Sequence, residues 1–253
     1  MARTVWDCAA LLGAIAGYDP KDPSSARVPV PDYTAGLEGA SLQGMRVGVP
    51  REYFWAEASE EVAGLARRAL AVLEELGARV VEVSLPTVHL SGPVGNVISW
   101  SEAAAWHEEW LRTRPDDYGA DVRQRFQSGL LLSAVQYHKA QRLRRLIRQE
   151  VLEALRQADV LVTPTCPVEA PPVGEAFTRV KGRVVNTLLL LSRLTRPFNL
   201  AGVPALTVPC GFTRGGLPVG LQVVGREFQE ARVLQVGYAY EQATEWHRRR
   251  PEV

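Results

Sequence analysis

The stretch that most constrains this fold is residues 197–225, which read PFNLAGVPALTVPCGFTRGGLPVGLQVVG. It contains two short apolar runs, at 205–208 and 219–224, on either side of a segment rich in glycine and proline. Valine-rich runs of this length predict buried β-strands joined by a tight loop. Buried strands need helices over both faces of their sheet, so we expect most of the remaining chain to cover them.

Glycines and prolines in this stretch refine the expectation. Gly202 and Gly220 stand where a side chain would obstruct a close backbone approach or an unusual φ. Pro204, Pro209 and Pro218 are expected at the strand ends, where no ladder N–H is lost.

Length and composition limit the classes of protein to consider. The 253 residues suit one large domain or two small ones, and we expect a single α/β domain over residues 1–253. The net charge of +1 favours neither nucleic acid nor membrane as a partner. No apolar run reaches the roughly 18 residues of a membrane span, and no signal-peptide pattern opens the chain, so we expect a cytoplasmic protein.

The basic and sulfur-containing residues are also informative. Lysine occurs only at Lys21, Lys139 and Lys181, and arginine supplies the other positive charges. Such a bias, with proline-rich loops, is typical of a thermophile or of a GC-rich genome, and composition does not separate the two. The three cysteines are scattered without CxxC spacing, which favours reduced thiols over disulfides or a zinc site.

Hydrophobic periodicity predicts the elements of the first half. Residues 4–16 and 59–76 follow the helical period, with Thr4 and Ser59 as N-caps, and residues 18–43 form an irregular loop. Short apolar runs at 45–49 and 79–83 predict strands on either side of the second helix. Strand, helix and strand in this order make a parallel pair with a right-handed crossover.

The second half alternates helices with one more strand. Helices are expected at 94–113, 121–129, 130–157, 186–194 and 227–248, a strand at 159–163 and a long irregular loop at 166–182. The basic stretch 139–148 is interleaved with core leucines, so we interpret it as a solvated helix face and not as a nucleic-acid groove.

The sequence contains few patterns that are typical of catalysis. There is no G-x-S-x-G elbow, no phosphate-binding glycine loop, and no histidine paired at metal-ligand spacing, so no cofactor or metal is expected. Cys166 directly follows a buried strand, where α/β proteins place ligand groups. A packed small side chain is the simpler interpretation, and a nucleophilic thiol is the alternative.

Four segments, in order, resemble the amidase signature family, which includes bacterial amidases and the A subunit of the glutamyl-tRNA amidotransferase. They are MARTVWDCAALLGAIAGYDPKDPSS at 1–25, MRVGVPREY at 45–53, ADVLVTPTCPVEAPP at 158–172, and FNLAGVPALTVPCGF with GLPVGLQVVG at 198–225. The resemblance implies the C-terminal portion of an α/β/α fold with a mixed sheet covered by helices. It also implies hydrolysis of C–N bonds by a serine–serine–lysine triad.

The family's triad belongs to segments that precede the first match, so no catalytic residue can be assigned in this chain. The resemblance instead implies a substrate-pocket wall. Arg125, in VRQRF, resembles the arginine that contacts a substrate carboxylate in some members. Thr165, Cys166 and Phe198 lie where the family builds its acyl pocket. LSRLTRPFNLAG carries Arg193 and Arg196 in place of the acidic residue of the tRNA-linked members.

Three hypotheses follow. The chain is a C-terminal fragment of an amidase, inactive alone, which would bind a small amide if an N-terminal half completed it. It is a non-catalytic subunit that completes a split amidase or an amidotransferase of the tRNA-linked type. Or it is an unrelated thiol enzyme that uses Cys166. Because a missing half would expose a sheet edge, we also expect self-association or a partner chain.

Overall fold

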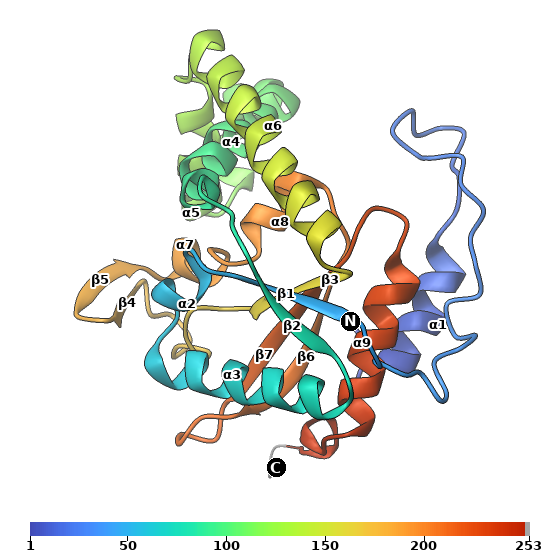
Figure 1. Ribbon diagram of the computed structural model, residues 1–253. Coiled ribbons are helices and arrows are strands. Elements are labelled where there is room, and N and C mark those ends of the chain that lie inside the picture. The colour runs from blue at the N-terminus through green and yellow to red at the C-terminus, as the bar shows by residue number, and fades with distance from the viewer. Residues whose placement is uncertain (251–253) are drawn as a thin grey trace.

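A computed structural model describes residues 1–250 as a mixed β-sheet surrounded by helices (Figure 1). The α-helices are α1 (Val5–Ile15), α2 (Phe54–Glu57), α3 (Glu60–Glu75), α4 (Ser91–Thr113), α5 (Ala120–Gly129), α6 (Ala134–Gln157), α7 (Thr187–Leu191), α8 (Arg196–Ala201) and α9 (Glu230–Gln242). Short 3₁₀ helices cover Val88–Leu90, Pro115–Asp117 and Trp246–Arg248. The strands are β1 (Arg46–Pro50), β2 (Arg79–Val83), β3 (Val160–Pro164), β4 (Phe177–Val180), β5 (Arg183–Asn186), β6 (Ala205–Phe212) and β7 (Pro218–Val224).

The main sheet has five strands in the order β2-β1-β3-β7-β6. Strand β1 runs parallel to both β2 and β3, whereas β7 runs antiparallel to both β3 and β6. The expected parallel pair and the mixed α/β sheet are therefore confirmed. Because β1, β2 and β3 are parallel, their carboxyl ends meet at one edge of the sheet.

The β6–β7 hairpin departs from its predicted form in one respect. β6 continues to Phe212, so Pro209 lies inside the strand and not at its end. The register shifts between Pro209 and Gly211, which is a bulge, and β6 is an edge strand. An edge strand with a bulge tolerates a residue without an N–H, which explains the difference. Gly202 has a φ of 68°, as expected for a helix end.

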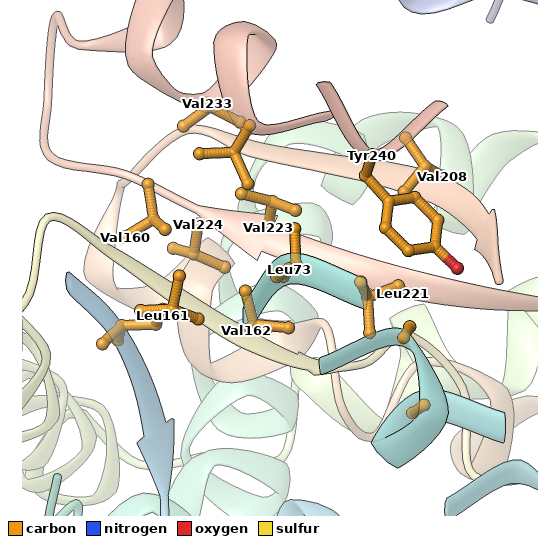
Figure 2. Packing of buried hydrophobic residues seen from close by; sticks show 14 of the residues in the cluster. Leu73, Val160, Leu161, Val162, Val208, Leu221, Val223, Val224, Val233 and Tyr240 are labelled. Carbon is orange, nitrogen blue, oxygen red and sulfur yellow. The ribbon is translucent and has the colours of Figure 1, made fainter. Parts of the chain in front are cut away.

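One apolar core joins the sheet to the helices over it. Leu161, Val162, Leu221 and Val223, from the two central strands, are completely buried. Figure 2 shows side chains from β3, β6 and β7 interleaved with those of α3 and α9 in this core. The apolar stripe of α3 faces the sheet, as its periodicity predicts, and Ser59 caps the helix by accepting from the Val62 N–H at 3.2 Å.

Helices α4, α5 and α6 gather into a separate layer at the top of Figure 1, with a smaller apolar cluster between α4, α6 and α8. The basic face of α6 is only partly solvated, which corrects our expectation. Arg144 donates to the Leu200 carbonyl at 2.9 Å, and Arg148 donates to the Ala201 carbonyl and to Glu227. These arginines bind the carboxyl end of α8, where helix carbonyls lack partners.

Several elements were missed in the sequence, including α2 and both strands of a hairpin. The expected loop at 166–182 contains β4, which pairs antiparallel with β5 in a second, two-stranded sheet. Lys181 and Gly182 form its turn with positive φ values of 46° and 77°. α8 was also missed, and α9 ends earlier than predicted. No helix within residues 1–250 combines the length and apolar character that crossing a membrane requires.

Candidate functional site

An open cavity of about 1030 Å³ lies at the carboxyl edge of the sheet. The end of β3, the start of β7 and the middle of β6 form its floor, and the 168–176 loop, β5 and α7 form its walls. Its lining residues are Asp121, Thr165, Cys166, Val168, Ala170, Pro171, Pro172, Gly174, Glu175, Ala176, Asn186, Thr187, Leu188, Leu191, Thr207, Pro218, Val219 and Gly220. Open α/β sheets bind ligands at this edge.

Thr165 and Cys166 both reach the cavity, as the sequence predicts for residues that follow a buried strand. The Thr165 hydroxyl lies 3.3 Å from the Thr207 hydroxyl across β7. Gly220 of β7 permits this approach, because a Cβ there would lie 2.7 Å from Thr207 and 2.9 Å from the Thr165 hydroxyl. A side chain at Gly220 would thus obstruct a close approach, as expected, and the groups that approach are two threonine side chains.

The thiol of Cys166 is half-buried and donates to the Leu191 carbonyl at 3.5 Å. Burial raises the pKa of this thiol, so the protonated form dominates at neutral pH. A nucleophilic cysteine needs a lowered pKa and a nearby base. No histidine lines the cavity among residues 1–250, so its surroundings favour a packed wall residue.

The walls are fastened from outside by the short helix α2. Glu57 forms ion pairs with Arg193, just after α7, and with Arg183 of β5, the latter at 3.8 Å. Lys181, in the hairpin turn, donates to the Ala56 carbonyl at 2.6 Å. Sequence reasoning missed this role of Glu57, because its partner Arg193 lies 136 residues away along the chain.

This region holds neither a catalytic lysine–serine pair nor a metal site among residues 1–250. All three lysines are exposed, and no hydrogen bond joins a lysine ammonium to a serine hydroxyl in the described part of the chain. Within residues 1–250, no three His, Cys, Asp or Glu side chains are grouped closely enough to hold a metal ion.

The family model for amidases matches residues 1–234. The chain belongs to the amidase family. It is 41% identical, over its whole length, to the A subunit of the glutamyl-tRNA(Gln) amidotransferase of Moorella thermoacetica and spans 55% of that protein. It is also 41% identical to an amidase of Pseudomonas putida, again over its whole length, and spans 54% of it. The chain therefore covers about half the length of these relatives.

Solved structures agree with this amidase-family assignment. A member of a vestigial protein complex, linked to the evolutionary origins of an s-triazine catabolic enzyme, superposes with a TM-score of 0.88 at 28% identity, with 95% of this chain matching 52% of that one. The A subunit of the glutamyl-tRNA(Gln) amidotransferase from Thermotoga maritima gives 0.75 at 36% identity, with 95% of this chain matching 51%. In both comparisons, the sheet and helices of this chain match about half of the solved chain.

The remaining expected site residues of this amidase-family chain lie outside the cavity lining. Arg125 bonds within its own helix, to the Asp121 carbonyl at 2.9 Å and to the Asp121 carboxylate at 2.7 Å. Asp121 belongs to the cavity lining and Arg125 does not. Phe198 is 1% exposed and stacks on Phe54 with 5.4 Å between ring centroids. The structure thus places Phe198 in the core, although the family resemblance suggested a pocket wall.

Proposed function

We propose that this chain supplies the substrate-pocket half of an amidase. In that role it binds a small amide for hydrolysis of its C–N bond, and a polypeptide segment outside these 253 residues brings the nucleophile. The observation that carries the proposal is the coverage: the whole chain aligns at 41% identity, yet with only 55% of the relative. The cavity at the sheet edge and the absence of a serine–lysine contact in residues 1–250 also support it.

Amide hydrolysis requires attack on the carbonyl carbon, stabilisation of the oxyanion and protonation of the leaving amine. In this proposal the residues of this chain perform none of these steps. Thr165, Val219 and Leu191 hold the acyl or amine substituent, and the walls orient the carbonyl toward the incoming nucleophile. Correct orientation alone supplies a large part of an enzyme's rate enhancement.

A non-catalytic subunit of an amidotransferase is the second candidate, because several relatives at about the same identity are named as A subunits of such enzymes. The charged residues around the start of α8 give this second candidate less support than the first. Arg193 and Arg196 replace an expected acidic residue, and Arg193 is already paired with Glu57. A thiol enzyme using Cys166 has the least support, because burial raises the pKa of the thiol.

The decisive experiment is complementation. The chain would be produced alone and together with the N-terminal half of the Pseudomonas putida amidase, and release of ammonia from a simple amide would be measured. We expect the chain alone to show no turnover and no labelling by a serine-directed fluorophosphonate. The pair should both hydrolyse the amide and be labelled. Turnover by the highly purified chain alone contradicts the proposal. A stable pair that binds but does not hydrolyse amides favours the second candidate.

A further inference from the structure

The charged groups around the cavity are unevenly distributed. Two carboxylates, Asp121 and Glu175, belong to its lining, and no lysine, arginine or histidine does among residues 1–250. A third carboxylate, Glu169, lies in the loop between lining residues, and one of its oxygens is buried without a hydrogen-bond partner. Asp121 forms an ion pair with Arg125, so the lining carboxylate without an ion-pair partner among residues 1–250 is Glu175, and the lining offers an anion no positive charge.

The nearby cations are committed to other partners. Arg125 is paired with Asp121 at 2.7 Å, and Arg193 and Arg183 are paired with Glu57. Lys181 is held by the Ala56 carbonyl. Redirecting Arg193 to a ligand would leave the largely buried Glu57 carboxylate without this partner, which costs free energy, whereas the more exposed pair of Arg125 and Asp121 costs less to break.

The rest of the surface is mainly apolar. Leu188 and Leu191 of α7, Val219 of β7 and the prolines of the 168–176 loop all belong to its lining. The β4–β5 hairpin and α7 lie beside each other at the left of Figure 1, next to α2. An apolar cavity of this kind favours an apolar group, and a carboxylate placed there would lose hydration without a compensating partner.

We propose that this cavity selects amides whose bound substituent has an apolar body, with or without a positively charged group. It rejects amides that carry a carboxylate. This inference rests on the proposed amidase function. A carboxylate-bearing ligand is disfavoured for two reasons: a lining carboxylate repels it, and its own carboxylate loses hydration without gaining a partner. The predicted carboxylate contact of Arg125 would not operate in this arrangement, because Asp121 neutralises that guanidinium.

A matched set of ligands tests this inference on the chain alone. The probes are 3-phenylpropanamide and its para-carboxy and para-aminomethyl derivatives, with dissociation constants measured by amide chemical shifts of Leu188, Leu191 and Val219. We expect the neutral and ammonium probes to bind, and the carboxylate probe to bind at least about tenfold more weakly. Equal or tighter binding of the carboxylate probe overturns the inference, and so does failure of all three to bind.

An engineered cation provides the second arm. Leu188→Arg adds a guanidinium to the cavity lining, and Leu189→Arg adds the same group one position along α7, outside the lining. Both leucines are exposed, so neither change disturbs the core. We expect Leu188→Arg to tighten carboxylate binding by about tenfold and Leu189→Arg to leave it unchanged. Equal effects of the two variants would contradict selection by the cavity.

These measurements need no catalysis. If complementation yields no hydrolysis while the three probes are still discriminated, the proposed function fails and the charge selection stands. If the completed enzyme hydrolyses carboxylate-bearing and neutral amides with equal kcat/KM, the function stands and the charge selection fails.

Discussion

The adjacent side chains of Thr165 and Cys166 each use their polar atom on a protein neighbour. The hydroxyl lies 3.3 Å from that of Thr207, and the thiol donates to the Leu191 carbonyl. Both are therefore held in position at the cavity surface. At this scale, the place of Thr165 and Cys166 after a buried strand predicted that they reach the cavity, whereas Arg125 and Phe198, which the family resemblance suggested, are not part of its lining.

The thiol of Cys166 should alkylate slowly at neutral pH. Burial raises its pKa above the ordinary 9.0, so the thiolate is scarce until the pH exceeds that value. We expect iodoacetamide to modify Cys166 at pH 7 at least about tenfold more slowly in the folded chain than in urea, with the rate still rising above pH 9. Peptide mass spectrometry measures this directly. If the alkylation rate of Cys166 reached half of its maximum below about pH 8, the thiol-enzyme hypothesis would gain support.

At the scale of elements, short helices and turns fix the cavity walls. α2 contains four residues, yet its Glu57 joins β5 and the segment after α7, and the neighbouring Ala56 carbonyl holds the hairpin turn. The two-stranded β4–β5 sheet is otherwise largely exposed, and an isolated hairpin is only marginally stable in water. Its order therefore depends on these contacts.

Glu57→Gln should loosen the hairpin. The Glu57 side chain is 20% exposed and that of its partner Arg193 is 26% exposed, so the pair is protected enough for its loss to cost about 1–2 kcal/mol locally. We expect hydrogen exchange at 177–186 to accelerate by about tenfold while the central strands are unchanged. Glu82→Gln is the matched control, because Glu82 forms a more exposed pair with Arg51. Identical protection in the two variants would contradict the role of Glu57.

Helices α1 and α9 are joined by a buried carboxylate. Glu241 is 4% exposed and accepts from the Val5 N–H at 3.0 Å, which binds the first turn of α1. Burial raises the pKa of Glu241 above its ordinary 4.5, and Asp7 raises it further, whereas the backbone N–H of Val5 and His247 oppose the shift. The charged form is thus disfavoured in the folded chain.

The stability contributed by Glu241 is complete below pH 4.5 and is lost as the pH rises through the folded-state pKa. Gln at this position keeps the acceptor and removes the charge. We therefore expect the free energy of unfolding of Glu241→Gln, relative to the unchanged chain, to increase as the pH rises from 4.5 to about 8. Urea denaturation across this range measures the difference. Glu245→Gln, at an exposed position, should show no such trend.

At the scale of the whole molecule, one sheet edge is available for pairing. β6 forms an edge of the five-stranded sheet, and Ala205 and Thr207 on it are exposed. Beside it, an apolar groove of about 230 Å³ lies between α1, β6 and α9. Leu11 and Ile15, which line the groove, are 46% and 72% exposed. Exposed edges and apolar patches promote association with another chain.

We therefore expect the isolated chain to self-associate through β6, and Ala205→Lys to weaken that association. A lysine on an edge strand opposes edge-to-edge pairing. Sedimentation velocity over a concentration series should show a lower average mass for Ala205→Lys. Ala243→Lys, which adds the same charge at an exposed position after α9, is the control. A monomer at every concentration for the unchanged chain would contradict the expectation.

The sequence by itself determined the central architecture. Continuous apolar runs identified β3, β6 and β7, the 3.6-residue period identified α3 and α6, and the order of elements predicted the parallel β1–β2 pair. These signals are local, because burial on both faces requires uninterrupted apolar residues and a helix requires its own period. The position of Thr165 and Cys166 at a strand end followed from the same logic.

Only the tertiary structure decided which charged residues pair over long sequence distances and which side chains are buried. The local sequence does not show that Glu57 joins Arg193 or that Phe198 is stacked inside the core, whereas the pair of Asp121 and Arg125 has the i,i+4 spacing of neighbours on one helix. Partners such as Glu57 and Arg193 are distant along the chain and meet only after the sheet has formed. The residue types set which groups can bind or pack, and the folded chain sets which of them face the cavity.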